Sequence, residues 1–308
     1  MDGKQLQEVF MGKQENGEKR QQDMAMHVSR ISILVNLLLS AGKLAAGIAA
    51  ASGAMISDAV HSASDVFSTI IVMVGIRMSG KAADKEHPYG HERMECVAAI
   101  ILAVVLALTG LQIGSSGVRK IAAGNYGDLQ VPGILALVAA VVSIAVKEWM
   151  YWYTRFYAKK INSAALMADA WHHRSDALSS VGAFIGIFGA RMGFPVMDPA
   201  ASVVISIFIL KAAYDIFKDA VDKMVDKACD DEVEQALRNF VLKQEGVLGI
   251  DLLRTREFGN KIYVDVDIIA DGSQTLTESH GIADRVHDGI EKNFEQVKHI
   301  MVHVNPQE

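Results

Sequence analysis

Two copies of one short motif, each set in an apolar segment, constrain this chain more than any other feature. The first copy runs from Ser57 to Ser68 and the second from Ala168 to Ser179, and a shift of 111 residues (172 minus 61) aligns them. Each copy places an aspartate four residues after a histidine, a spacing that puts both side chains on one face of a helix. An aspartate near the bilayer centre costs roughly 2.5–3.5 kcal/mol, so such faces should meet each other. The chain is therefore predicted to be a helical bundle with an internal polar site.

The aligned copies predict a metal site between two neighbouring helices. Two imidazoles and two carboxylates that converge on one point form a tetrahedral nitrogen and oxygen set, which suits Zn²⁺. The expected ligands are His61, Asp65, His172 and Asp176. Two further aligned aspartates, Asp58 and Asp169, would either gate the two approaches to this site or act as helix caps and hydrogen-bond partners of the ligands. The alternative is a soluble helical protein with hydrogen-bonded buried histidines, but it does not explain the duplication.

Composition limits the class of protein. Of the 308 residues 51% are hydrophobic, as expected for a membrane protein with a soluble part. The two cysteines stand alone in the sequence, so neither a disulfide framework nor a CxxC zinc site is expected. A net charge of −6 argues against a nucleic-acid partner. The polar start of the chain contains no apolar core of a cleavable signal peptide.

Six apolar segments are predicted to span the membrane in contact with lipid. Their approximate limits are 31–51, 55–77, 97–118, 129–146, 163–190 and 199–218. The fourth is expected to end at Val146, before an aromatic membrane-interface belt that begins at Trp149. Lys and Arg concentrate in the loops after the second and fourth segments and after the sixth, which predicts cytoplasmic termini. The two motif helices then run antiparallel, as in the inverted repeats of many secondary transporters. The expected location is the inner membrane of a bacterium.

The sequence pattern changes near residue 223 to that of a small soluble domain. A helix capped at Asp230 or Asp231 should precede two strands that meet at a Gly259–Asn260 turn. A second helix is expected to open at Thr277, and a third strand to cover 299–304. The order αββαβ predicts an α+β domain with a ferredoxin-like arrangement. A domain this small is only marginally stable alone, which favours association of two copies.

These predictions give the chain three parts. The expected parts are a cytoplasmic tail (1–28), a six-helix transmembrane domain (29–222) and a cytoplasmic α+β domain (223–308).

The motifs together resemble the cation diffusion facilitator family of metal/proton antiporters. The likeness rests on the paired HxxxD motifs of the second and fifth spans, the loop pattern DxxHPxGH and the αββαβ tail with its Leu-Arg-Thr-Arg run. It covers almost the whole chain beyond the first 28 residues. The resemblance implies a homodimer that exports a divalent metal from the cytoplasm in exchange for protons. It also implies that the paired-motif residues form the transport site, and the set of two His and two Asp is associated with zinc.

The resemblance implies three further features. Loop residues Asp84, His87 and His91 match positions that bind zinc in some relatives, although they would also suit a solvated polar loop. Tail positions that hold metal between two cytoplasmic domains correspond to Asp251, Asp267, His280 and His303. Asp251 and Asp267 stand where some relatives have His, and Asn305 stands where they have Asp. The neutral oxygen of Asn305 is a weak ligand, so the tail site is expected to be weaker or absent. An ion pair is implied between Arg93 and Asp226.

Other functions remain open at this point. The same bundle could export Mn²⁺, Fe²⁺, Co²⁺ or Cd²⁺. An intramembrane zinc metalloenzyme would keep one ligand position for water and place a general base beside it. The chain offers four ligands and no HExxH glutamate, which favours transport over hydrolysis. A third possibility is a metal sensor that signals through its tail. No enzymatic activity is expected.

Overall fold

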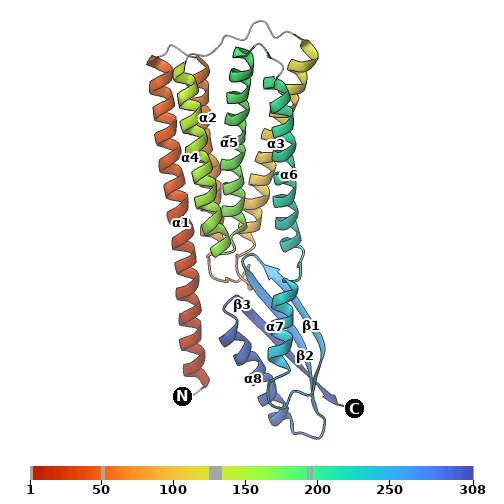
Figure 1. Ribbon diagram of the computed structural model, residues 1–308. Coiled ribbons are helices and arrows are strands. Elements are labelled where there is room, and N and C mark those ends of the chain that lie inside the picture. The colour runs from red at the N-terminus through yellow and green to blue at the C-terminus, as the bar shows by residue number, and fades with distance from the viewer. Residues whose placement is uncertain (1–2, 50–52, 125–133, 193, 195–196, 308) are drawn as a thin grey trace. The chain divides into compact units, whose positions relative to one another are not determined.

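The computed structural model of the protein describes residues 3–49, 53–124, 134–192, 194 and 197–307, which fall into two compact units (Figure 1). One unit contains residues 21–81 and 94–221, and the other contains the residues up to Arg20 together with 82–93 and 222–308. The long helices are α1 (Gly3–Ala49), α2 (Gly53–Ser79), α3 (Met94–Ala123), α4 (Ile134–Lys160), α5 (Ala164–Arg191) and α6 (Met197–Met224). The remaining elements are α7 (Asp231–Val241), β1 (Gly249–Phe258), β2 (Lys261–Asp271), α8 (Leu276–Asn293) and β3 (Val297–Gln307).

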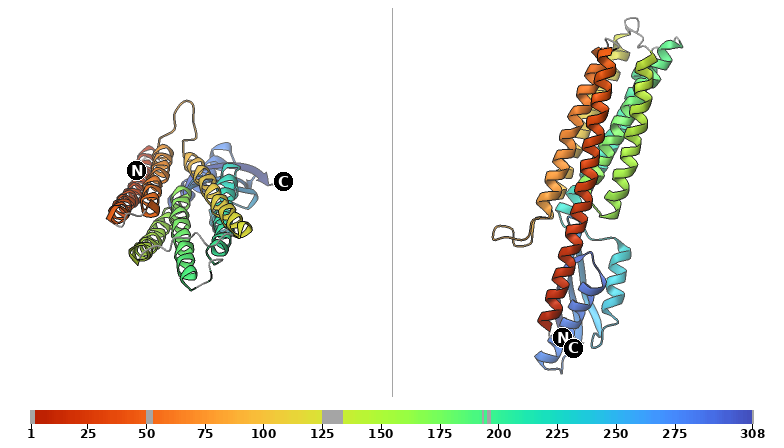
Figure 2. Two further views of the ribbon diagram at one scale, coloured as in Figure 1. Left: turned by 90° about the horizontal axis from the view of Figure 1, so that it is seen from above. Right: turned by 90° about the vertical axis from the view of Figure 1, so that its left-hand side faces the viewer.

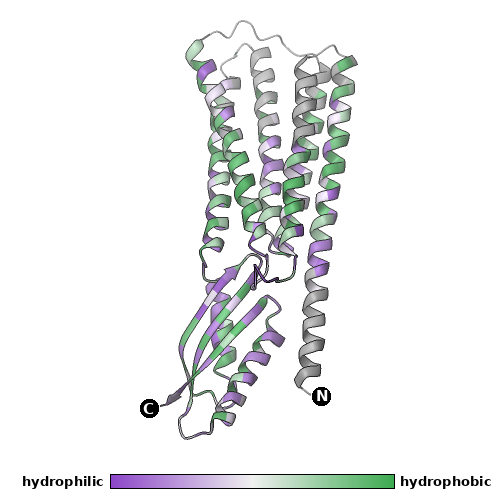
Figure 3. Ribbon diagram, turned by 180° about the vertical axis from the view of Figure 1, so that it is seen from behind, coloured by the Kyte–Doolittle hydropathy of each residue, from purple (hydrophilic) through white to green (hydrophobic). Residues whose placement is uncertain are grey.

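The helices of the first unit run side by side and are largely apolar over their described length (Figures 2 and 3). Among the described residues, two stretches are long and apolar enough to cross a membrane, Lys19–Ala45 within α1 and Met94–Ala123. Helix α1 begins at Gly3, whereas a polar tail was predicted as far as residue 28. The helix continues into this polar region because its sequence contains no proline and is rich in Gln, Glu, Lys and Met, which are good helix formers.

A tight turn sets the positions of α4 and α5 against each other. Asn162 adopts a left-handed conformation, with φ of 51°, that ends α4. The Ser163 hydroxyl accepts a hydrogen bond from the Leu166 backbone N–H at 3.2 Å and so caps the start of α5. The same hydroxyl donates to the Glu95 carboxylate of α3. Because the turn is so short, α4 and α5 form an antiparallel pair with a fixed register.

Helices α2 and α3 approach closely at Gly75. A Cβ atom at this position would overlap the Ala98 side chain, so the contact requires the missing side chain. Val72 and Ile76 of α2 are buried beside it. The close packing of these apolar residues fixes α2, which carries the first copy of the motif.

The C-terminal part of the second unit is a three-stranded sheet packed on two helices. Strands β1 and β2 pair antiparallel, whereas β2 and β3 pair parallel through the crossover helix α8. Helix α8 begins at Leu276, one residue before the predicted Thr277, because Thr275 and Glu278 form a capping box. Alternate residues of β2 face the helices and form the core with α7 and α8. This core includes Val264, Val266, Ile268, Leu237, Val241, Ile282, Val286 and Ile290.

The loop that joins α2 to α3 packs on this domain within the same unit. The Tyr263 hydroxyl of β2 donates a hydrogen bond of 2.9 Å to the Tyr89 carbonyl. Gly259 turns the β1–β2 hairpin with φ of 66°, and a Cβ there would strike the backbone of Glu92. The Lys298 ammonium donates to the Glu92 carboxylate. Loop 82–93 and the sheet are therefore one packed structure.

Candidate metal centre

Three of the four predicted ligands converge in the interior of the helical unit. Asp65 comes from α2, and His172 and Asp176 come from successive turns of α5. Their ligand atoms all lie within 4.8 Å of one another, and all three side chains are buried. The His172 Nε2 atom lies 3.7 Å from Asp65 Oδ1 and has no hydrogen-bond partner among the described residues. A buried imidazole nitrogen next to two carboxylates is a donor set suited to a divalent cation.

The contacts between α2 and α5 show that the two motif copies run in opposite directions. Asp65 faces His172 at 3.7 Å, and Thr69, one turn further along α2, donates a hydrogen bond of 3.3 Å to Asp169. Moving forward along α2 therefore means moving backward along α5. The duplicated motif thus forms an antiparallel pair of helices, as the inverted-repeat prediction requires.

His61 lies on α2 one turn before Asp65, but its side chain falls outside the described part of the structure. The same holds for Asp58. The fourth predicted ligand and the first predicted gating residue therefore remain predictions.

Lys147 also enters the site, and sequence reasoning missed it. Its ammonium lies 2.5 Å from Asp65 Oδ2 and 2.8 Å from Asp176 Oδ2, and the side chain is 2% exposed. The fourth span was predicted to end at Val146, but α4 continues to Lys160, so Lys147 lies in the middle of the helix. The two carboxylates supply the countercharge that lets the ammonium stay buried. The aromatic residues that follow Lys147 were a usable sequence signal. Taken as a continuation of the helix, they place Lys147 within α4 and not at its end.

Part of that aromatic run also packs inside the unit. Tyr151 is buried and meets Trp171 edge-on, with ring centroids 5.6 Å apart. The Arg174 guanidinium lies 4.3 Å from the Tyr151 ring centroid. The predicted membrane-interface belt is thus wrong for Tyr151, whereas Trp149 and Trp152 are exposed.

A second buried polar layer lies one turn away from the three ligands. Asp169 is completely buried, and its Oδ2 atom lies 3.5 Å from His173 Nε2. The His173 ring in turn approaches the Ser32 hydroxyl of α1 at 3.4 Å. Asp169, predicted to gate or to support the ligands, therefore contacts Thr69 and His173, and the structure places it beside the ligand cluster.

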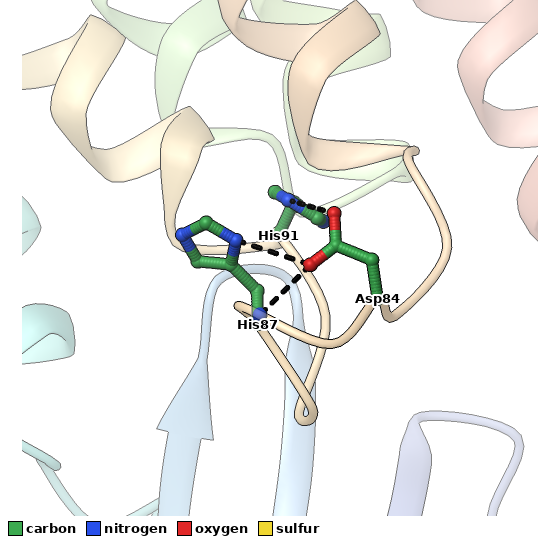
Figure 4. Close-up of side chains that lie close together, drawn as sticks. All are labelled: Asp84, His87 and His91. Carbon is green, nitrogen blue, oxygen red and sulfur yellow. Dashed lines mark hydrogen bonds and ion pairs between the residues drawn. The ribbon is translucent and has the colours of Figure 1, made fainter.

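The three loop residues form a second cluster (Figure 4). The Asp84 carboxylate lies between the two imidazoles, 3.3 Å from His87 Nδ1 and 3.5 Å from His91 Nε2. It also accepts hydrogen bonds from the backbone N–H groups of Glu86 and His87, at 3.0 and 2.8 Å. These backbone bonds orient the carboxylate toward both rings.

The four predicted ligands of the tail do not come together within a single copy of the protein. Among the described residues, no three of them bring their ligand atoms within 4.8 Å. Asp267 and His303 are register partners on β2 and β3. Asn305 Nδ2 donates a hydrogen bond of 2.7 Å to Asp251. His280 lies 3.1 Å from Asp284, and both side chains are on the exposed face of α8.

The ion pair implied between Arg93 and Asp226 is present. The Arg93 guanidinium also lies 4.6 Å from the Phe258 ring centroid.

Cys229 is a poor candidate for a metal ligand. Its thiol is buried, and burial raises its pKa above the ordinary value. A thiol that stays protonated is a poor metal ligand.

Comparison with known families covers nearly the whole chain. Residues 29–225 match the family model described as Cation efflux transmembrane domain. Residues 229–307 match the one described as Cation efflux protein, cytoplasmic domain.

Several curated proteins are similar over most of the chain. Metal tolerance protein C1 of Arabidopsis thaliana is 33% identical over 95% of this chain, which spans 63% of that protein's length. An uncharacterized transporter of Methanocaldococcus jannaschii is 33% identical over 89% of this chain and 96% of its own length. Manganese efflux system protein MneP of Bacillus subtilis is 31% identical, with 92% of this chain and 97% of that protein covered.

Proposed function

Because the chain belongs to the cation diffusion facilitator family, whose members are membrane transporters and not enzymes, we propose that it exports a divalent metal from the cytoplasm. The observation that carries this proposal is the convergence of the buried Asp65, His172 and Asp176 on one point. Two buried carboxylates are costly without countercharge. Lys147 supplies one positive charge for the two, whereas a divalent cation would supply two, which supports placing the cluster on the cargo path.

Zn²⁺ is the proposed cargo. His61, one turn before Asp65 on α2, would complete a set of two nitrogens and two carboxylates, and Zn²⁺ accepts this tetrahedral coordination without strain. Mn²⁺ prefers six harder oxygen ligands. It is nevertheless the second candidate, because the similar MneP carries the name of a manganese efflux protein.

Protons are the proposed counter-substrate. A metal binds these ligands only in their deprotonated forms, so metal and protons compete for the same groups. The same imidazole nitrogen of His172 can hold either a proton or a metal ion, so this side chain could exchange one for the other. Metal would enter from the cytoplasm, the helices would reorient, and protons from the opposite side would promote its release.

The proposal includes an architecture and an assembly. All six long helices would span the membrane with both termini in the cytoplasm of a bacterial cell, and the α+β domain would be ferredoxin-like. Two copies would associate through their cytoplasmic domains, for which the matched cytoplasmic family domain gives support. Asp84, His87 and His91 would hold a second metal, and Asp251, Asp267, His280 and His303 a weak third one.

Vectorial uptake into proteoliposomes tests the function. Wild-type protein should accumulate Zn²⁺ in vesicles under an imposed pH gradient, while Asp65→Asn and Asp176→Asn should fall to background. The matched control is Asp215→Asn, because Asp215 is an exposed carboxylate on α6. Uptake that persists in a well-folded Asp176→Asn protein would remove the site assignment. Wild-type uptake of Mn²⁺ with no Zn²⁺ uptake would favour the second candidate.

A further inference from the structure

Lys147 binds the two carboxylates that the proposed metal would use. Its ammonium bridges the Oδ2 atoms of Asp65 and Asp176, at 2.5 and 2.8 Å, from a helix that carries neither copy of the motif. Zinc binds carboxylate oxygens at about 2.0–2.2 Å. A metal held by both aspartates would therefore lie against the ammonium and be repelled by it.

The register of α4 and α5 makes this placement a built-in feature. Lys147 lies 15 residues before Asn162 and Asp176 lies 14 residues after it, so the short turn brings both to the same depth. Asp65 reaches the same point from α2. Three helices thus converge to place one ammonium between two carboxylates.

We propose that Lys147 is a tethered substitute for the cargo, which neutralises the two carboxylates in the empty carrier and leaves them when a divalent metal enters. This inference rests on the proposed function. The ammonium stays charged throughout and only changes position, which its flexible four-carbon stem permits. Lys147 is thereby a specificity-determining residue, because the cargo must compete with a bound cation.

The alternative is an ion pair that serves the fold alone and remains in place when metal binds. Both roles predict a less stable metal-free protein without the lysine charge, since two buried carboxylates would lose their partner. They differ in the direction of the change in metal affinity. If the metal must displace the lysine, the apparent affinity is the intrinsic affinity multiplied by the fraction of molecules whose site is open. Removal of the lysine should therefore strengthen metal binding.

The test measures Zn²⁺ binding to the purified full-length protein by calorimetry, for wild type and Lys147→Met. The dissociation constant should fall at least roughly tenfold, as it does when a competing state held about nine tenths of the molecules. Lys147→Arg keeps the charge and should stay within about threefold of wild type. Lys211→Met, the control, removes an exposed ammonium from α6 and should change nothing. The rise in Tm on adding Zn²⁺ should be larger for Lys147→Met than for wild type.

Transport provides a second readout. Without the tethered cation the empty carrier holds uncompensated charge, so Lys147→Met should show a lower KM for Zn²⁺ together with a lower kcat. If the Met variant does not fold, Lys147→Gln, which keeps an N–H donor, takes its place in both measurements.

Three results would overturn the inference. A folded neutral variant that binds Zn²⁺ no better than wild type would show that the ammonium does not compete with metal. Failure of both neutral variants to fold even with Zn²⁺ present would show that the fold needs the ammonium in the loaded state too. Wild-type protein that binds neither Zn²⁺ nor Mn²⁺ would overturn the proposed function and this inference together, whereas the first two results leave that function intact.

Discussion

His172 Nε2 lies 3.7 Å from Asp65 Oδ1, so the histidine of one motif copy meets the aspartate of the other. The site is thus assembled between the two copies, and neither α2 nor α5 alone contains it. An exchange at either helix should therefore alter the ligand set of the same centre.

Selectivity should follow that ligand set. His172→Asp would replace a nitrogen by a harder oxygen and favour Mn²⁺ over Zn²⁺. The ratio of Mn²⁺ to Zn²⁺ uptake should rise at least roughly tenfold, the effect of about 1.4 kcal/mol in ligand preference. His61→Asp should act in the same direction. Uptake of both metals under one pH gradient measures the ratio, with His287→Asp on α8, a histidine outside all the proposed ligand sets, as the control. An unchanged ratio in folded His172→Asp would exclude this histidine as a ligand.

The loop cluster should bind one metal ion that transport does not need. Asp84→Asn keeps the oxygen that accepts the backbone bonds of the loop but removes the charge between the two histidines. The number of Zn²⁺ ions bound per chain should fall by one while uptake continues. Asp271→Asn is the matched control, because Asp271 accepts a similar backbone bond from Ser273 and belongs to neither clustered ligand group of the described residues. The same stoichiometry in Asp84→Asn and wild type would remove the loop site.

The tail should adjust transport without carrying it. His303→Ala should lower the apparent metal affinity or the fraction of dimer while vesicle uptake persists, because the buried site completes the cycle alone. Met301→Ala, an exposed change on the same strand, controls for altered packing. Complete loss of uptake in folded His303→Ala would place essential chemistry in the tail.

The start of α8 should weaken in acid. The Thr275 backbone N–H donates to Glu278 at 2.8 Å and holds the pKa of Glu278 below its ordinary value. A folded-state pKa that is depressed contributes stability above the unfolded value of about 4.3, and this stability is lost as the pH falls through the folded value. Protection of the amides at the start of α8 from hydrogen exchange should therefore decrease as the pH falls below about 4.3. Glu278→Gln should lack this drop, whereas exposed Glu295→Gln should retain it.

The ion pair of Arg93 with Asp226 should contribute little by itself. Asp226 has φ of 63°. Its side chain is 47% exposed and that of Arg93 is 31% exposed. Asp226→Asn keeps a residue that tolerates the left-handed backbone and should cost less than about 1 kcal/mol of domain stability. Asp226→Ala should cost roughly 1–2 kcal/mol more because of backbone strain. Hydrogen exchange of the sheet amides compares the two; equal costs would contradict this division.

Local sequence patterns predicted much of the fold and the membership of the family. The β1–β2 turn at Gly259–Asn260 and the αββαβ order of the tail follow from alternation and turn residues, and the structure has both. The start of α8 was misplaced because Thr275 and Thr277 both resemble a cap, and only the bond to Glu278 distinguishes them. Lys147 was missed for a different reason. Its role depends on the depth at which α4 faces α5, which the Asn162 turn determines, and on a countercharge from α2.

The hydrogen bond from Tyr263 to Tyr89 has a consequence for making hybrid proteins. The matched family domains divide the chain near residue 227, yet loop 82–93 belongs to the same compact unit as residues 222–308. Exchange of the C-terminal segment with that of a relative would pair a foreign sheet with the native loop. The loop would then keep these contacts only where the foreign segment supplies a tyrosine at position 263 and a glycine at position 259. Functional chimaeras should therefore transfer the loop and the C-terminal segment together.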